Sequence, residues 1–559
     1  MEEQIQKIFK GEVESDDETL KHYSRDASIF DIRPQVVVFP KDSEDVKNLV
    51  KWVGENKAKY PELSITARAA GTCMSGGSIN ESIIMDFTRH MNKLISFDDA
   101  NEITVQPGMF YRDFEKITLE KGMILPCYTA SKSINAVGGM FGNNSAGEKT
   151  LKYGKTEDYV VEAKIVFTDG NEYTVKSLTQ VELEKKIAQN DFEGEIYKKI
   201  SNLIKENEEE IKQAKPRVHK NSAGYYIWNV VKDFPIPSFN LNKLLVGSQG
   251  TLGIVTEITF KLVPNPKYSK LVAIFMKNTD PLGRLVDEIL ETKPETLETY
   301  DDKTMKLAVR FFPDFLKNKG FVGMIKFMWS FLPELFMMIR GGFPKLILLA
   351  EYSGESDDDV QRKCEVLVQK IKHFNLKMHI TKSEAEANKY WDIRRESFAL
   401  LRKHVAGKHT APFIDDIIVR PEFLPKFLPE LNNILGQYDI TYTLAGHAGD
   451  ENFHIIQLMD FKRDDTAKIV TELSDKVFDL VVHYHGSITA EHNDGIIRTP
   501  YLSKMFSGHI LQIFKEIKDT FDTKNILNPG KKIAVPGGIG TKEYIKNHII
   551  KEPKVVSNS

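Results

Sequence analysis

Apolar and polar residues alternate in two different patterns in two successive parts of this chain of 559 residues. Within residues 34–266, short apolar runs such as 36–39 and 82–86 alternate with helical patterns and glycine-rich segments. Beyond a turn-forming pair of prolines at the end of this region, strands alternate with long amphipathic helices, for example at 357–374. The change of pattern predicts two successive domains, both of the α+β class.

We therefore divide the chain into five segments. They are an N-terminal helical segment (1–33), a cofactor-binding domain (34–266), a substrate or cap domain (267–505) with a hydrophobic insertion (311–345), a C-terminal helical segment (506–535) and a peripheral tail (536–559). The apolar residues between 510 and 517 have helical spacing, and we expect this C-terminal helix to return to the cofactor-binding domain.

The composition is that of an ordinary globular protein. Hydrophobic residues make up 41%, charged residues 28%, and the formal net charge is −3, which gives no electrostatic footprint for nucleic acid. Cys73, Cys127 and Cys364 form no Cys-x-x-Cys pair, so we expect a reducing compartment and no iron–sulfur cluster held by this chain alone. The N-terminus is polar and acidic, unlike a secretory signal, which predicts a cytoplasmic protein.

One segment departs from this pattern. Residues 321–339 are rich in Phe, Met, Trp and Leu, but Lys326, Pro333 and Glu334 interrupt them, so the segment is a poor membrane span. It is either a core or subdomain helix pair or an interfacial surface that rests on the inner face of a membrane. The sequence leaves both interpretations open.

Three clusters of small residues lie in the first domain. The first follows a strand-like run and consists of Arg68, Ala69, Ala70, Gly71, Thr72, Cys73, Met74, Ser75, Gly76 and Gly77. It is neither a Walker loop nor a dinucleotide fingerprint, so alone it is weak evidence for a phosphate site. The other clusters span 135–147 and 246–256. Three such loops in one domain suggest a large, extended cofactor that backbone must approach closely.

The second domain contains a group of residues suited to a metal. A glycine-rich turn separates His447 from His454, and a later small-residue loop places Glu491 beside His492. Two imidazoles and one carboxylate make a plausible divalent metal site. An isolated histidine is more often structural, and we keep that interpretation for the remaining histidines of this domain.

These motifs together resemble a known family. With the turn at Val105-Gln106-Pro107-Gly108, the three loops resemble the FAD-binding domain of the vanillyl-alcohol oxidase and p-cresol methylhydroxylase superfamily. Gly-His-x-Gly-Asp-x-Asn-x-His, Ala-Glu-His and the tail 521–531 resemble the FAD-linked oxidase C-terminal domain of D-lactate, glycolate and D-2-hydroxyglutarate dehydrogenases. The resemblance implies a two-subdomain FAD-binding domain followed by a cap domain with an antiparallel sheet flanked by helices.

The resemblance also implies which residues contact FAD. Residues 68–77 are expected at the pyrophosphate, Pro107 and Gly108 in a supporting turn, and the flavin neighbourhood includes Gly138, Gly139, Asn143 and Ile254. The remaining expected contacts are Ser133, Ser145, Gly250, Gly253 and Asn528. Because the first loop contains no histidine, we expect FAD to be bound non-covalently.

The same resemblance assigns the metal and substrate residues. His447, His454 and Glu491 are expected to hold zinc, or else manganese or iron, with His492 as a base of near-neutral pKa. The substrate carboxylate is expected at Arg394, with Arg395 in reserve and with Lys220 and Asn221 nearby. The alternative for Arg394 is an ion pair on a helix surface.

We therefore expect an FAD-dependent dehydrogenase that oxidises D-lactate, D-2-hydroxyglutarate or glycolate. In human-type hydroxyglutarate enzymes a lysine helps to hold the distal carboxylate, and Ile414 stands in that place here, which weakens the dicarboxylate assignment. No cysteine-rich extension follows Lys532, so the expected acceptor is separate: a quinone, an electron-transfer protein or an iron–sulfur subunit. A homodimer remains open. The alternatives are a non-redox alkyl-glycerone-phosphate synthase and a flavin-binding subunit of a larger complex.

Overall fold

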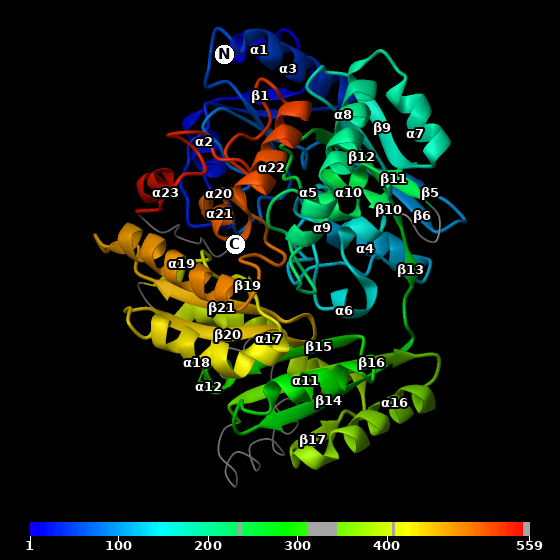
Figure 1. The fold of residues 1–559 in the computed structure, drawn as a ribbon, viewed down its shortest axis with the longest axis vertical. Helices are drawn as coiled ribbons and strands as arrows, with labels where there is room; N and C mark the ends of the chain where they lie inside the picture. Colours follow the sequence, from blue (N-terminus) through cyan, green and yellow to red (C-terminus); the bar gives the residue numbers. More distant parts are fainter. Residues whose placement is uncertain (233–236, 311–343, 405–407, 552–559) are drawn as a thin grey trace.

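A computed structural model describes residues 1–232, 237–310, 344–404 and 408–551, and within these ranges the side chains of 307–310 and 395–404 are not described. The hydrophobic segment 321–339 and the side chain of Arg395 therefore lie outside the described residues. A small sheet, two large sheets and a two-stranded ribbon, β7 (Met123–Ile124) with β13 (Val263–Pro264), organise the described chain (Figure 1).

The first sheet is small and mostly parallel. Its strand order is β1 (Glu12–Glu14), β2 (Val36–Phe39), β4 (Ile83–Asp86), β3 (Ile65–Arg68). Helix α3 (Ser43–Asn56) begins at Asp42, whose side chain accepts a hydrogen bond from the backbone N–H of Asp45. Its buried apolar face packs with residues of this sheet in one core, and the first glycine cluster starts where β3 ends.

The second sheet is antiparallel and has seven strands. Their order is β10 (Val231–Lys232), β11 (Ser238–Asn240), β9 (Glu172–Leu178), β8 (Val160–Val166), β12 (Ile254–Lys261), β6 (Glu102–Val105), β5 (Leu94–Phe97). The helices of the first 266 residues are α1 (Glu2–Gln6), α2 (Asp17–Tyr23), α3, α4 (Tyr111–Glu120), α5 (Val137–Asn143), α6 (Thr150–Tyr153), α7 (Gln180–Ile187), α8 (Phe192–Glu206), α9 (Glu208–Ala214) and α10 (Asn242–Leu245).

The third sheet is the largest and is antiparallel throughout. Its order is β17 (Lys377–Ile380), β14 (Tyr268–Met276), β16 (Leu346–Gly354), β15 (Thr296–Asp301), β20 (Thr441–His447), β21 (Asn452–Met459), β18 (His409–Thr410), with β19 (Asp416–Ile418) also on β21.

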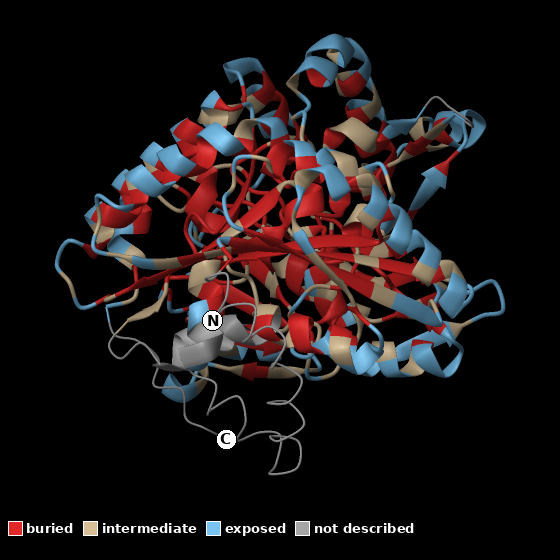
Figure 2. Cartoon of the chain, turned by 90° about the horizontal axis from the view of Figure 1, so that it is seen from below, coloured by how far each residue is buried: buried red, intermediate tan, exposed pale blue. Residues whose placement is uncertain are grey.

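Helices cover both faces of this third sheet. On one face the helices are α11 (Leu282–Leu290), α16 (Asp357–Lys370), α18 (Leu424–Leu435) and α19 (Thr466–His483). On the other they are α12 (Asp302–Arg310) and α17 (Glu384–His404). Buried residues concentrate along the strands and on the inner sides of these helices (Figure 2). The predicted antiparallel sheet flanked by helices is confirmed.

The last described part of the chain, residues 495–551, lies among the N-terminal elements (Figure 1). It contains α20 (Gly495–Arg498), α21 (Leu502–Met505), α22 (Gly508–Phe521) and α23 (Lys542–His548). After α22 the chain runs parallel to β3, where the N–H of Ile65 donates to the carbonyl of Ile526 at 2.7 Å. Among the helices that the structure describes, none has the length and apolarity needed to cross a bilayer.

Candidate functional site

The three glycine clusters lie against one another. Gln249 of the third cluster donates hydrogen bonds from its side-chain amide to Asn143 of the second at 3.3 Å and to Ser75 of the first at 3.5 Å. A Cβ placed on Gly139 would lie only 3.7 Å from the Cβ of Ala69. Side chains larger than those present would fill the space between the clusters. This arrangement fits the close backbone approach that a bound FAD requires.

Gly71 in the first cluster and Gly108 in the supporting turn occupy positions where a side chain would not fit. Gly71 has φ +66°, in the left-handed region that disfavours a side chain. A Cβ on Gly108 would lie 2.0 Å from the carbonyl oxygen of Phe87, so no larger residue fits the turn. The preceding carbonyl, of Pro107, accepts a hydrogen bond from the N–H of Gly138 at 2.8 Å, so the predicted supporting turn holds the second cluster.

Asn528 joins the clusters to the C-terminal segment. Its side-chain amide donates to the carbonyls of Gly77 at 2.9 Å and Gln249 at 2.7 Å, and its side-chain oxygen accepts from the hydroxyl of Thr66 at 2.9 Å. The residue is fully buried. A single amide therefore fixes the first and third clusters relative to β3.

Of four further predicted FAD residues, three have contacts within the protein and one is exposed. A Cβ on Gly253 would lie 2.5 Å from a methyl of Ile165, and Ile254 is buried in the core beside the first sheet. The carbonyl of Ser145 accepts from the hydroxyl of Thr156 at 2.8 Å. Ser133 is exposed in the loop before α5. The contacts of these four with FAD stay predictions.

The two histidines of the metal motif face the same side of the third sheet. In the register of β20 and β21, His447 pairs with Asn452 and Ala445 pairs with His454, and paired residues project from the same face. The centroids of the two imidazoles are 5.2 Å apart. The hairpin thus brings together two side chains that are seven residues apart in the sequence.

Glu491 completes this group from a separate loop. Its carboxylate lies 3.4 Å from Nε2 of His447 and 4.0 Å from Nε2 of His454. Candidate ligand atoms of the three residues all lie within 4.8 Å of one another. The structure therefore brings the three predicted metal ligands together.

Two of these three groups have protonation states that suit a metal. Burial, together with His447 and His492, lowers the pKa of His454 to about 4, so its ring is neutral. Burial opposes ionisation of Glu491, but Lys220 and His447 hold its pKa well below the usual range. Burial likewise lowers the pKa of His447, but Glu298 outweighs it and raises that pKa to about 9. A metal would replace this proton, and the donor set fits zinc, manganese or iron.

Asp416 organises the loop that carries Glu491 and His492. One oxygen of its carboxylate accepts hydrogen bonds from the N–H groups of Ala490, Glu491 and His492 at 2.7–2.9 Å and from the hydroxyl of Thr489 at 2.8 Å. Its other oxygen lies 4.0 Å from Nδ1 of His454. The sequence analysis missed this residue, whose only signal is an acidic pair inside an otherwise apolar run.

His492 is held by a second carboxylate. Its Nδ1 lies 2.6 Å from the carboxylate of Asp415, which also pairs with the buried Arg498. Burial lowers the pKa of His492, but Asp416 and Asp415 outweigh it and raise the pKa to about 9. In this state the residue is protonated at neutral pH, so the prediction of a near-neutral pKa is wrong. The ring stacks on His454 with centroids 5.2 Å apart.

The predicted substrate residues are only partly brought to this group. Arg394 lies on α17 with its side chain 8% exposed, paired with Glu298 and 3.5 Å from Nδ1 of His447, so it is not a helix-surface residue. Lys220 is buried between Glu491 at 2.5 Å and Asp450 at 2.8 Å. Asn221 instead accepts a hydrogen bond from the hydroxyl of Ser487 at 2.7 Å, which positions the loop.

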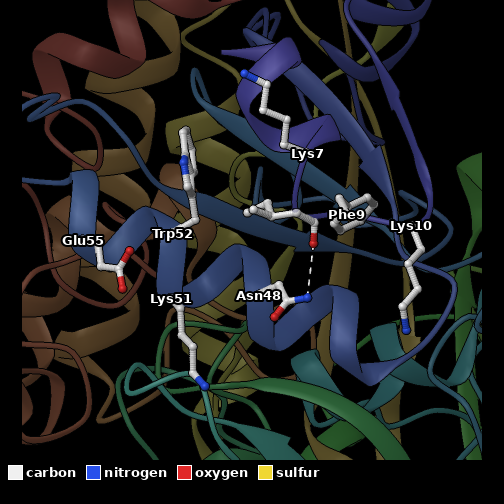
Figure 3. Close-up of a pocket in the computed structure, with 8 residues that line it drawn as sticks. Lys7, Phe9, Lys10, Asn48, Lys51, Trp52 and Glu55 are labelled. Carbon is white, nitrogen blue, oxygen red and sulfur yellow. Dashed lines mark hydrogen bonds between the residues drawn. The ribbon is translucent and has the colours of Figure 1, made fainter.

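A surface pocket of about 480 Å³ lies elsewhere, between the N-terminal segment and α3 (Figure 3). Lysines and Trp52 line it, and the side chain of Asn48 donates to the carbonyl of Ile8 across it at 3.1 Å. Its lining contains none of the residues predicted for FAD, metal or substrate.

Comparison with protein families decides the relationship. A family described as "FAD binding domain" matches residues 34–176, and one described as "FAD linked oxidases, C-terminal domain" matches residues 265–532. The chain belongs to the FAD-linked oxidase family. FAD is accordingly supported as the cofactor of this family member.

Several characterised members are distant relatives. The D-2-hydroxyglutarate dehydrogenase of Pseudomonas putida is 27% identical over 535 residues, which are 95% of this chain and 51% of that protein. The glycolate oxidase subunit GlcD of Bacillus subtilis is 28% identical over 519 residues, 92% of either chain. The D-lactate dehydrogenase of Anaerostipes hadrus is 25% identical over 508 residues, 89% of either chain. The chain spans about half the length of the first D-2-hydroxyglutarate dehydrogenases it matches.

Solved structures show the same fold. The p-cresol methylhydroxylase structure has a TM-score of 0.66 at 15% identity and covers 94% of either chain. An alkyldihydroxyacetonephosphate synthase structure has a TM-score of 0.63 at 15% identity, covering 93% of this chain and 82% of that one. The predicted p-cresol methylhydroxylase-type fold of this family member is confirmed.

Proposed function

We propose that the protein oxidises a D-2-hydroxy acid to the 2-oxo acid, with FAD as the hydride acceptor and a divalent metal at His447, His454 and Glu491. One observation carries the proposal: these three residues converge within 4.8 Å, with His492 stacked beside them and Arg394 next to His447. The names of the relatives support the substrate class, since they refer to D-2-hydroxyglutarate, glycolate and D-lactate.

When bound, FAD supplies the acceptor for the hydride from the substrate Cα, and a divalent metal lowers the pKa of the substrate hydroxyl. His447 is prepared for such a metal because its Nδ1 donates to Glu298 at 2.6 Å, which leaves Nε2 free to bind. His454 is neutral and Glu491 is ionised, as ligands must be.

His492 acts as the base in this proposal. Its Nδ1 donates to Asp415, so Nε2 is the atom that takes the hydroxyl proton. The high pKa of His492 reflects the carboxylates around it. Once the neighbouring residues hold a cation, we expect His492 to lose its proton more readily and to become a competent base.

Arg394 binds the substrate carboxylate in this proposal. Its guanidinium is nearly buried and lies on the sheet face that carries both histidines. An arginine fork is suited to a carboxylate, and a low-dielectric setting strengthens the contact. A bound flavin would need a separate electron acceptor: a quinone, an electron-transfer protein or an iron–sulfur subunit.

The substrate can be identified by anaerobic reduction of the flavin. Purified protein would be mixed with D-lactate, D-2-hydroxyglutarate, glycolate and the L-enantiomers, and the flavin absorbance followed with and without a chelator. We expect bleaching by a D-acid or by glycolate, and loss of bleaching after chelation. Because Ile414 is fully buried in the core and offers no cation, D-2-hydroxyglutarate should react more slowly than D-lactate.

A flavin band unchanged by every acid would contradict the proposal. It would favour the non-redox alternative of the alkyl-glycerone-phosphate synthase type or a subunit whose catalyst is another chain. Bleaching that survives chelation would leave the redox function in place and remove the metal from it.

A further inference from the structure

Glu298 is a buried carboxylate that contacts both halves of the candidate site. It lies in the middle of β15, the strand next to β20, and is fully shielded from solvent. Its Oε1 accepts a hydrogen bond from Nδ1 of His447 at 2.6 Å, and its Oε2 forms an ion pair with the guanidinium of Arg394. His447 is a proposed metal ligand and Arg394 the proposed substrate anchor.

A glutamate at this place is costly unless both contacts are used. An ionised carboxylate taken out of water loses its hydration, and only charged or hydrogen-bonded partners offset that loss. Burial opposes ionisation of Glu298, but Arg394 and His447 together lower its pKa below the usual value. Its neighbours on the same face, such as Tyr300 and Ala445, belong to an apolar core beneath α17. The carboxylate therefore sits in an apolar layer with its charge directed at these two side chains.

The two contacts have different consequences. A carboxylate on Nδ1 fixes the imidazole in the tautomer whose Nε2 can bind a metal, and it raises the basicity of that nitrogen. An ion pair on Arg394 holds one edge of the guanidinium, so the fork keeps one orientation toward the sheet face. One side chain on a rigid central strand thus determines the geometry of both.

We infer that Glu298 is a positioning residue that couples the metal ligand His447 to the substrate anchor Arg394. The inference rests on the proposed function, because it assigns roles to residues of that site. It adds a residue whose removal weakens metal binding and acid binding together, although it is expected to touch neither the metal nor the acid.

The test compares four purified FAD-loaded variants with the wild type. Glu298→Gln keeps the shape and removes the charge, whereas Glu298→Asp keeps the charge and shortens its reach. Arg394→Met removes the substrate anchor and leaves the hydrogen bond of Glu298 to His447 in place. Glu295→Gln is the matched control, since Glu295 is also a buried, ion-paired glutamate next to β15, but its partners are Lys149 and Lys152. Zinc affinity is measured by competition with a chromogenic chelator, and KM and kcat with the acid that reduces the flavin.

We expect Glu298→Gln to weaken zinc binding roughly 10- to 100-fold, the range found when an outer-shell partner of a metal-bound histidine is removed. The KM for the acid should rise at least tenfold in the same variant, with Glu298→Asp between it and the wild type. Arg394→Met should raise KM with a smaller loss of zinc affinity than Glu298→Gln shows, because the hydrogen bond of Glu298 to His447 remains. Glu295→Gln should change neither.

The inference is overturned if Glu298→Gln binds zinc as tightly as the wild type, or if its KM rises no more than that of Glu295→Gln. Wild-type protein that binds no zinc overturns it as well. If no acid reduces the wild-type flavin but Glu298→Gln still loses zinc affinity, the proposed function fails while the positioning of His447 stands.

Discussion

Nδ1 of His492 donates a hydrogen bond to Oδ2 of Asp415 over 2.6 Å, while Oδ1 of the same carboxylate pairs with the fully buried Arg498 at 2.5 Å. The arginine holds the pKa of Asp415 far below its usual range although burial opposes this, so the carboxylate stays charged. Because Asp415 is fixed, its hydrogen bond holds the imidazole of His492 in one orientation and one tautomer, as a general base requires.

Replacing Asp415 with Asn should slow flavin reduction by the acid roughly 10²- to 10⁴-fold, because an amide can stabilise the wrong tautomer of His492. Stopped-flow absorbance would measure the rate. Metal analysis should show an unchanged content, since the side-chain hydrogen bonds described for Asp415 go to His492 and Arg498 and not to the three proposed ligands. Asp439→Asn, at a surface pair with Arg463, is the control. A rate within twofold of the wild type would exclude Asp415 from the mechanism.

Replacing His454 with Asn should abolish stoichiometric metal binding. The neutral imidazole of His454 contributes a nitrogen that an amide replaces poorly as a ligand for zinc. Metal content by mass spectrometry and the zinc-dependent rise in melting temperature would both be lost. His483→Gln, an exposed histidine at the end of α19, should keep both. Equal metal content in the two variants would contradict the predicted site.

FAD should be released from the chain by acid or heat, and mass spectrometry should then give the mass of the unmodified protein.

Replacing Asn528 with Ala removes three hydrogen bonds, each worth about 0.5–1.5 kcal/mol, and should weaken FAD binding at least roughly tenfold. Fluorescence of released FAD would give the dissociation constant. Thr66→Val removes one of the three bonds and should have a smaller effect. Flavin that stays with the denatured wild-type chain would show a covalent link and contradict the prediction of non-covalent FAD.

The stability of the protein should depend on Glu451 in a defined pH range. Burial and Glu422 raise the pKa of Glu451 to about 7 in the folded state, against about 4.5 when unfolded. The folded state therefore favours the protonated form, so stability falls as the pH rises from about 4.5 to about 7.

Replacing Glu451 with Gln should raise the free energy of unfolding by about 1–3 kcal/mol at pH 8 and by nothing near pH 4.5. Thermal or urea unfolding of the metal-free protein at both pH values would measure this. Glu472→Gln, at an exposed helix pair with Lys468, should show no such difference. An equal effect at both pH values would exclude the ionisation of Glu451 as the cause.

Much of the fold could be predicted because its signals are local. The apolar run 36–39 is β2, and the pattern at 357–374 is α16 with the short 3₁₀ turn that follows it. The helical spacing between 510 and 517 belongs to α22, whose N-cap is Ser507. The histidine hairpin was also predictable, since a glycine-rich turn between two histidines leaves few other geometries.

The residues that orient the site could not be predicted in the same way. Glu298 comes from β15, and the adjacent Asp415 and Asp416 come from the segment that enters β19. Each acts through a contact that depends on how these strands lie in the third sheet. A single acidic residue in a strand gives no sign of what it will face. The pKa of His492 was mistaken for the same reason, because the two carboxylates that raise it are 77 and 76 residues away in the sequence.

The position of Asn528 has a consequence for biosynthesis. Thr66, its hydrogen-bond partner on β3, is 462 residues earlier in the chain. At about 5–20 residues per second, a ribosome needs roughly 20–90 s to synthesise the intervening chain. During this time the first glycine cluster has been synthesised but lacks the side-chain amide of Asn528, which fixes it to the third cluster. A nascent chain lacks this part of its predicted flavin pocket until Asn528 has been synthesised, so we expect FAD to bind after that point and not to the N-terminal domain as it emerges.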